Sequence, residues 1–280
     1  MEIRKLSKEE HIRTRKLSEE IFQEDTPKFL DYYYSVKTKE NEIYVIEEEG
    51  NIVSMVHLNP YEMRIKDRVY TTHYIVAVAT DPKYRRQGLM ARLLHHVMQV
   101  MADRGEPFTF LMPASEAIYK PFGFEFVYEQ RQGKVKGSTP TNQRIQYVLA
   151  EMKDCKQIAD FANEQLKQYD ITTWRTAEYY EMILAEQISE NGGILLAMQG
   201  QTLVGVFCFG KEEQVELREP LFVEEGILEG AIYHLIGNEE EPVSCSGYGT
   251  ETKPMIMAKV LQPGWTEYFK NQKVFINEVV

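Results

Sequence analysis

Hydrophobic residues recur along the chain with two spacings, one typical of helices and one typical of strands. Repeats of three and four residues predict amphipathic helices, such as the one that places Leu89, Leu93, Val97 and Met101 on one face. Continuous apolar runs that end at turn residues predict buried strands, such as residues 73–80. The order of these segments predicts an α/β fold with a mixed, mostly antiparallel sheet flanked by helices.

The same order of elements is predicted twice. Two helical segments precede a hairpin with its turn at Gly50, and two more precede a hairpin with its turn at Gly200. Residues 133–141, Gly-Lys-Val-Lys-Gly-Ser-Thr-Pro-Thr, have the composition of a linker. We therefore predict two domains, residues 1–135 and 145–280, that form a degenerate tandem repeat.

A turn rich in positive charge joins the strand at residues 73–80 to the helix that follows it. Pro82 ends the strand because it cannot donate to a ladder, and Arg85, Arg86 and Gly88 come next. The first N–H groups of a helix lack partners and carry the positive end of the helix dipole, and a glycine lets the backbone approach a ligand. The turn therefore predicts a site for a phosphate or pyrophosphate.

This turn differs from the common nucleotide-binding loops. Neither Gly-x-x-x-x-Gly-Lys-Ser/Thr nor Gly-x-Gly-x-x-Gly occurs there, and no motif that would hold Mg²⁺ lies near Gly88. These differences disfavour a nucleotide-phosphate enzyme. A turn that only caps the helix is the structural alternative.

Residues 78–90, Val-Ala-Thr-Asp-Pro-Lys-Tyr-Arg-Arg-Gln-Gly-Leu-Met, resemble the acetyl-CoA loop of the GNAT acyltransferases. Arg85, Gly88 and Met90 fill the family pattern Arg/Gln-x-x-Gly-x-Gly/Ala, and Met90 departs from the small residue that is usual at the last place. This departure and residues 115–124, Ser-Glu-Ala-Ile-Tyr-Lys-Pro-Phe-Gly-Phe, are similar to the Eis branch of the family. The resemblance covers the first of the two predicted domains.

The resemblance implies tandem GNAT-like domains of which only the first binds acetyl-CoA, as a co-substrate and without a metal. In the second copy Glu224 and Glu225 precede the glycine, where they would repel a pyrophosphate. Eis relatives assemble as oligomers, which implies a homo-oligomer, and carry a third, sterol-carrier-like domain for which residues 261–280 are too few. The coenzyme-binding residues implied by the resemblance are Val78, Ala79, Thr80, Arg85, Arg86, Gln87, Gly88, Leu89, Met90, Ala91, Ser115 and Glu116.

The resemblance also assigns the proton-transfer groups. Tyr119 matches the family's general acid, and the general base would be the C-terminal carboxylate, here Val280. A phenol can protonate a departing thiolate, because its pKa of about 10 lies above the thiol's value of about 8.5. The structural alternative for Tyr119 is an aromatic side chain in contact with Phe122. By residue type alone, further candidates for the base are Glu24, Asp25, His57 and His73.

The predicted acceptor is a small cationic amine. The net charge of −11 is compatible with a cationic substrate and argues against nucleic acid or an anionic membrane as a partner. Three adjacent tyrosines, residues 32–34, cannot share one helix face, so at least one should point at solvent or a cleft. We predict that Glu24, Asp25 and Tyr33 bind the substrate, with a polyamine or an aminoglycoside as the chemical type.

Cysteine usage and hydropathy predict a cytoplasmic protein. Cys155, Cys208 and Cys245 are an odd and widely spaced set without the spacing of a metal site. The first residues lack the apolar core of a signal peptide, and no apolar run reaches the length of a membrane span.

Together these patterns predict an acetyl-CoA-dependent N-acetyltransferase in which a primary amine attacks the thioester directly within a ternary complex. The alternative is a non-catalytic protein on the same fold that senses acyl-CoA or another small molecule. Release of free thiol in the presence of an amine distinguishes the enzyme from the sensor.

Overall fold

The computed structural model describes residues 1–140, 142, 144–211, 214–237, 241–265, 269 and 272–278. The chain divides into two units. Unit 1 contains Met1–Tyr128, Asp170–Thr173 and the described residues from Met255 onward, and unit 2 contains the described residues of Glu129–Tyr169 and Trp174–Pro254. Residues from Met255 onward, which the sequence analysis gave to the second domain, thus group with unit 1. The domain boundaries at 1–135 and 145–280 stay a prediction.

The helices at the start of unit 1 begin at capping residues. Ser7 and Glu10 form a capping box, after which a 3-10 helix (Lys8–Thr14) leads into α1 (Arg15–Ile21). The hydroxyl of Thr26 accepts a hydrogen bond of 3.1 Å from the N–H of Phe29, and α2 (Pro27–Ser35) starts with a proline in its first turn.

The strands of unit 1 form a mixed, mostly antiparallel sheet. Neighbouring strands lie in the order β1-β2-β3-β4-β5-β13, in which β4 and β5 are a parallel pair and the other neighbours are antiparallel. A second parallel pair is formed by β8 and β14. β8 pairs with the end of β3, and β14 pairs with β8. The bounds are β1 Ile3–Lys5, β2 Glu42–Glu48, β3 Asn51–Ile65, β4 Arg68–Thr80, β5 Phe108–Leu111, β8 Ile171–Thr173, β13 Glu251–Val260 and β14 Val274–Phe275.

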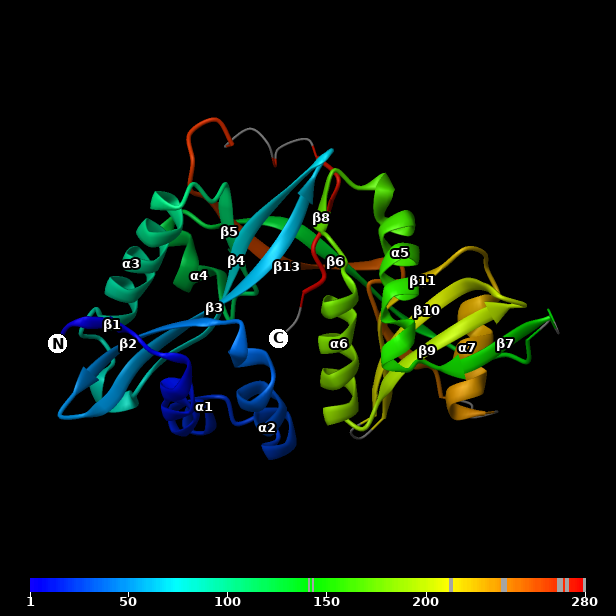
Figure 1. Ribbon diagram of the computed structural model, residues 1–280, viewed down its shortest axis with the longest axis horizontal. Coiled ribbons are helices and arrows are strands. Elements are labelled where there is room, and N and C mark those ends of the chain that lie inside the picture. Colours follow the sequence, from blue (N-terminus) through cyan, green and yellow to red (C-terminus); the bar gives the residue numbers. More distant parts are fainter. Residues whose placement is uncertain are drawn as a thin grey trace. The chain divides into compact units, whose positions relative to one another are not determined.

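Helices cover both faces of this sheet (Figure 1). On one face Leu17 of α1 packs with Ile43 and Val45 of β2. On the other face α3 (Leu89–Asp103) contacts β2, where the rings of His96 and Tyr44 lie 5.5 Å apart. The fold class that the sequence predicts is therefore confirmed. The remaining short helices are 3-10 turns at Lys37–Lys39, Pro82–Tyr84 and Lys120–Phe122, and α4 (Glu116–Tyr119).

β4 and β5 are tied together at one end only. The carboxylate of Glu106 lies 2.9 Å from Nδ1 of His73 and accepts a hydrogen bond of 3.1 Å from its backbone N–H. The hydroxyl of Thr109 donates to the backbone carbonyl of His73 at 2.7 Å. The hydroxyl of Thr72 donates to the backbone carbonyl of Phe108. The two strands then pair at Tyr74 and Phe110 alone. His73 is thus part of a structural clamp, with its partner carboxylate buried beside it.

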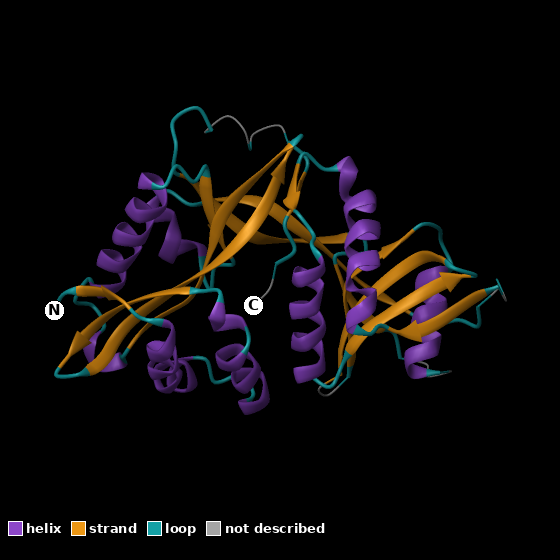
Figure 2. Ribbon diagram, in the orientation of Figure 1, coloured by secondary structure: helices purple, strands orange, loops and turns teal. Residues whose placement is uncertain are grey.

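Unit 2 repeats the layered plan (Figure 2). Its strands lie in the order β7-β9-β10-β11-β12-β6. α5 and α6 pack on one face of this sheet, and α7 packs on the other. The bounds are β6 Glu125–Val135, β7 Ile145–Leu149, α5 Cys155–Gln165, α6 Ala177–Ser189, β9 Gly193–Gln199, β10 Thr202–Lys211, β11 Val215–Phe222, α7 Ile227–Ile236 and β12 Val243–Ser246, with 3-10 turns at Met152–Asp154 and Leu166–Gln168.

The two units share two backbone irregularities. Ala77 in β4 and Glu219 in β11 have φ of 49° and 48°, and at each the register with the preceding strand shifts by one residue. Gly88 and Gly226, with φ of 76° and 88°, stand at the N-caps of α3 and α7. A bulged strand followed by a glycine-capped helix therefore occurs twice, which supports the tandem repeat expected from the sequence.

A buried polar group lies beneath α2. His57 of β3 has no exposed surface, and its Nδ1 lies 2.9 Å from the hydroxyl of Tyr33. Nδ2 of Asn41 donates to the same hydroxyl at 3.3 Å. Burial lowers the pKa of His57 to about 3, so the imidazole is neutral at physiological pH. A base this weak and this buried is a poor general base, which argues against the catalytic alternative for His57.

We predict that acid weakens the fold through His57. Its folded-state pKa is depressed, so below about pH 6.5 the unfolded chain binds the additional proton. The free energy of unfolding should therefore decrease by about 2 kcal/mol between pH 7 and pH 5 from this group. His57→Gln should flatten this dependence, although His11, whose pKa burial also lowers, retains part of it. Denaturant unfolding at several pH values tests this, and equal pH slopes for the two proteins would contradict it.

Candidate active site

The loop after β4 has the geometry of an anion cradle. Arg86 and Gly88 both have positive φ, of 62° and 76°, and Gly88 is the N-cap of α3. No side chain caps this end of the helix, so its first N–H groups remain available to a ligand. Alternating backbone conformations of this kind turn successive N–H groups toward one anion. The exposed loop therefore joins fixed backbone donors to the helix dipole, as the sequence predicts.

Side chains hold this loop against the end of β4. The carboxylate of Asp81 accepts a hydrogen bond of 2.8 Å from the N–H of Lys83, and Asp81 N–H donates to Val53 at 2.9 Å. Nε of Arg85 donates to the carbonyl of Thr80 at 3.2 Å. Arg85 thus fixes the loop to the strand, and Arg86 is the arginine at the positive-φ position of the cradle.

A pocket of about 450 Å³ opens where β4 and β5 separate. Residues 75–78 of β4 line one side, and residues 112–114 after β5 line another. The bulge at Ala77 interrupts the ladder between β3 and β4 here, because Val56 of β3 faces two residues of β4 instead of one. A non-glycine residue with positive φ in a strand is strained, and such strain is concentrated at functional sites.

Tyr119, at the end of α4, lies in this pocket. Its residue is 7% exposed, and burial raises the pKa of the phenol. No hydrogen bond to its hydroxyl occurs within the described part of the chain. The ring contacts Phe124 at a centroid distance of 6.0 Å, whereas Phe122 contacts His95. The phenol is therefore protonated at neutral pH and available to donate.

The structure gathers part of the predicted site into this one pocket. Glu24 and Asp25 follow α1, Tyr33 lies on α2, and all three line the pocket together with Val78 and Tyr119. Their roles stay predictions, but their placement agrees with a substrate pocket.

Other predicted coenzyme residues have structural side-chain contacts. Ala79 is 3% exposed in the core, and the hydroxyl of Thr80 lies 2.8 Å from that of Ser54, so either would contact a coenzyme through its backbone. Leu89 is buried, and Met90 and Ala91 are half-buried in the first turn of α3. Ser115 and Glu116 do not line the pocket, and Glu116 pairs with Lys120 at 3.1 Å.

Neither the bulge nor the apolar wall of the pocket has a signal in the sequence. Ala77 carries no residue-type signal for a positive φ, since glycine or asparagine would be the usual indicator. Phe22, Phe29 and Met112 also line the pocket, and each reads in sequence as an ordinary core residue.

Val280 lies outside the described residues, so its predicted role stays a prediction. The tail before it is held in unit 1: β14 pairs with β8, and the rings of Phe275 and Tyr128 lie 5.6 Å apart. Glu278 is 2% exposed. Burial, with a further contribution from the charge of Glu278, raises the pKa of Tyr74, which lines the pocket. The described tail thus ends near the pocket wall.

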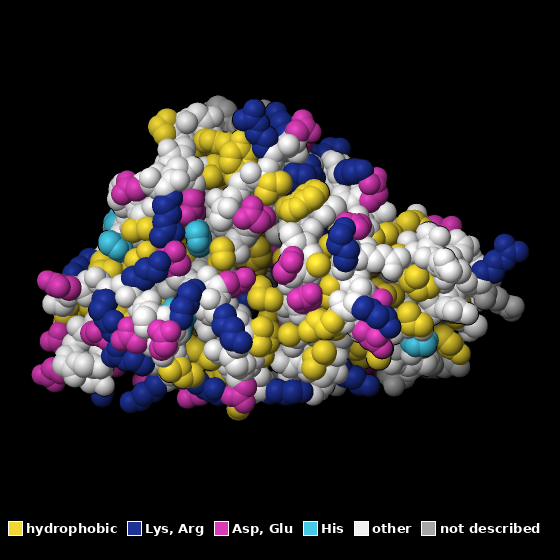
Figure 3. Space-filling model, in the orientation of Figure 1, with side chains coloured by type: hydrophobic (Ala, Val, Ile, Leu, Met, Phe, Trp, Pro, Cys, Tyr) yellow, Lys and Arg dark blue, Asp and Glu magenta, His cyan; other side chains and the backbone are white. Residues whose placement is uncertain are grey.

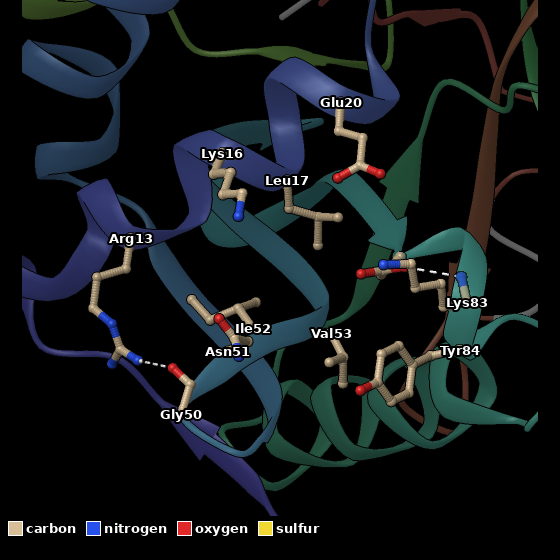
Figure 4. A pocket seen from close by; sticks show the side chains of 11 residues that line it. Arg13, Lys16, Leu17, Glu20, Gly50, Asn51, Ile52, Val53, Lys83 and Tyr84 are labelled. Atoms are coloured by element: carbon tan, nitrogen blue, oxygen red, sulfur yellow. Dashed lines mark hydrogen bonds between the residues drawn. The ribbon is translucent and has the colours of Figure 1, made fainter.

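A second cavity, of about 360 Å³, lies beside the cradle loop (Figure 4). Lys16 and Glu20 of α1 line it, with Asp81, Lys83 and Tyr84 from the start of the loop. Figure 4 shows Lys16 pointing into the space and the hydrogen bond from Arg13 to the carbonyl of Gly50, which measures 3.3 Å. Its charged lining differs from the apolar lining of the pocket that contains Tyr119.

The residue at the bulge of unit 2, Glu219, forms a buried ion pair. Nη2 of Arg175 lies 2.9 and 3.0 Å from the two carboxylate oxygens of Glu219, and the Arg175 side chain is fully buried. The guanidinium also stacks 4.4 Å from the ring centroid of Tyr179. Glu224 and Glu225 are exposed before Gly226. This charge distribution is unsuited to a diphosphate.

Comparison with known proteins identifies the first unit. A family model described as an acetyltransferase (GNAT) domain matches residues 2–127. This domain is that of an acyltransferase, enzyme class 2.3.1, and implies acetyl transfer that depends on an acyl-CoA. No curated protein matches the sequence.

Solved structures share the fold at low sequence identity. A probable N-acyltransferase from Enterococcus faecalis is 17% identical, with a TM-score of 0.77 over 93% of this chain and 72% of its own. Eis1 from Mycobacterium abscessus is 10% identical, with a TM-score of 0.66 over 94% and 74%. A tandem GNAT protein from clavulanic acid biosynthesis is 10% identical, with a TM-score of 0.59 over 94% and 99%. These likenesses establish the fold.

Membrane-spanning helices and metal clusters are both absent from the described residues. None of their helices has both the length and the hydropathy to cross a bilayer. No group of three or more His, Cys, Asp or Glu side chains among them is arranged to hold a metal ion. Basic and acidic side chains are interspersed on the face of unit 1 that Figure 3 shows.

We predict that the cradle requires glycine at position 88. Gly88→Ala should cost about 1 kcal/mol of stability through its positive φ, and should weaken binding of CoA about tenfold by moving the diphosphate away from the amides. Gly105→Ala is a matched control, because Gly105 has φ of 81°, stands at the opposite end of α3 and would also meet nothing within 4 Å. Calorimetric titration measures both. Equal CoA affinities in the two variants would contradict the assignment.

Proposed function

We propose that the protein transfers the acetyl group of acetyl-CoA to the primary amine of a small cationic acceptor, by direct attack within a ternary complex. The observation that carries this proposal is one strand, β4, which leads from the bulge at Ala77 in the pocket of Tyr119 to the anion cradle at Gly88. A thioester and a diphosphate are the two ends of one CoA molecule, so a single ligand would occupy both places.

The diphosphate would lie on the amides of residues 87–89, with Arg86 adding charge. The pantetheine arm would then run along residues 78–80 of β4, in the opening that separates this strand from β5. Its thioester carbonyl would lie near the bulge, where the broken ladder leaves backbone donors to polarise it. The acceptor would enter between α1 and α2, beside Glu24, Asp25 and Tyr33.

The chemistry requires two proton transfers. The neutral amine nitrogen attacks the thioester carbon, and the tetrahedral intermediate collapses by breaking the carbon–sulfur bond. Tyr119 would protonate the departing thiolate, for which its raised pKa keeps it in the acid form. The amine's proton would leave to a base, and we propose the C-terminal carboxylate of Val280, which follows the buried Glu278 closely in the chain.

A cytoplasmic location fits this proposal. Cys155, Cys208 and Cys245 are free and buried, as thiols in a reducing compartment are.

Replacement of Tyr119 tests the proposal. Tyr119→Phe should lower kcat at least about 100-fold and leave CoA affinity nearly unchanged, because the hydroxyl acts on the leaving group only. Tyr44→Phe is the control: Tyr44 is buried on the opposite face of the sheet, and its hydroxyl donates to Glu42 at 3.1 Å. The assay follows free thiol from acetyl-CoA with a panel of amines. Binding of acetyl-CoA without thiol release for any amine would favour the sensor instead.

A further inference from the structure

We propose that the acceptor is an amphipathic diamine: a primary amine joined through an apolar spacer to a second cation, which Glu24 binds. This inference rests on the proposed function and specifies its substrate class. It narrows the sequence expectation, under which polyamines and aminoglycosides are equally suitable.

The wall of the Tyr119 pocket is mainly apolar. Phe22, Phe29 and Leu30 line it from α1 and α2, and residues 75–78 and 112–114 line it from the strands. The volume of about 450 Å³ is ordinary for a small-molecule site, and a lining of this kind stabilises hydrocarbon by removing it from water.

Most polar groups in this lining already have partners. The hydroxyl of Tyr33 is bound by His57 and Asn41, and that of Tyr74 by the backbone of Met112. The hydroxyl of Ser18 lies 2.7 Å from that of Tyr34. A ligand with hydroxyl or amine groups along its middle would bury them against hydrocarbon, at a cost of about 1–3 kcal/mol for each unpaired group.

Two further polar residues of the lining, Tyr119 and Glu24, differ in exposure. Tyr119 is buried at 7% exposure and marks the interior, whereas Glu24 is exposed and marks the mouth. The Glu24 carboxylate makes no ion pair or hydrogen bond within the described part of the chain, and Asp25 beside it adds negative charge. A ligand that spans the pocket would therefore place its reacting amine near Tyr119 and a second cation near Glu24.

Three amines of nearly equal length separate the parts of this proposal. Octamethylenediamine has the apolar spacer and both cations, spermidine replaces one spacer methylene by an amine, and nonylamine replaces one terminal amine by a methyl group. We expect octamethylenediamine to exceed spermidine in kcat/KM by about tenfold or more, because the internal amine of spermidine must be desolvated. We expect it to exceed nonylamine by about two- to fivefold, as an exposed ion pair allows.

A variant of Glu24 assigns the second effect. Glu24→Gln should remove the advantage of octamethylenediamine over nonylamine, because it lowers kcat/KM for octamethylenediamine to the value for nonylamine in the same variant. Glu19→Gln is the matched control, since Glu19 is an exposed residue of α1 outside the pocket and pairs with Arg15 at 2.8 Å. It should preserve the preference.

The outcomes separate this inference from the proposed function. If spermidine reacts as well as octamethylenediamine, the proposed requirement for an apolar spacer is wrong. If nonylamine reacts with the wild type as well as octamethylenediamine does, the proposed requirement for a second cation is wrong. Either result leaves acetyl transfer intact. If acetyl-CoA binds but none of the amines releases thiol, the proposed function fails and the inference fails with it.

Discussion

The separation of β4 from β5 is the constraint on which the rest of the site depends. Parallel neighbours would ordinarily continue their ladder, but here the bonds among Thr72, His73, Glu106 and Thr109 hold one end, and the strained bulge at Ala77 stands where the strands diverge. These bonds hold β4 against β5 at one end, and the bulge interrupts the β3–β4 ladder beside the place where β4 and β5 separate. A pocket and an anion cradle then follow one another along a single strand.

In the second unit, a buried ion pair lies at the position that corresponds to the bulge of the first unit. Glu219 has the bulge conformation of Ala77, but its side chain binds the buried Arg175. Removal of either partner would leave an uncompensated buried charge, so the role of this ion pair is structural. The glycine-capped helix is also retained, with two carboxylates before it in place of two arginines. Shared backbone geometry therefore coexists with opposite electrostatics, and only the first unit suits a diphosphate.

Features set by local backbone chemistry could be predicted from sequence. The glycine start of α3 is confirmed, and like the capping box at Ser7 and the cap at Thr26 it depends on residues that are neighbours in the chain. Tyr119 was predicted through resemblance, whereas the other three predicted pocket residues, Glu24, Asp25 and Tyr33, came from charge and residue type. Their position in one pocket depends on contacts between distant segments of the chain. The bulge at Ala77 and the apolar wall were missed, because they arise from pairing between distant strands, for which a lone alanine or phenylalanine carries no signal. The neutral state of His57 likewise depends on burial by α2, which spacing alone does not reveal.

Hydrogen exchange with and without CoA tests the central claim, that the diverging end of β4 and the cradle after it hold one thioester carrier. Addition of CoA should slow exchange of the amides of residues 78–80 and 87–90 together, because the first group would pair with pantetheine and the second with diphosphate. The matching amides of unit 2, residues 219–228, should exchange at unchanged rates. Protection at residues 219–228, or no protection on either side of Arg86, would contradict the account.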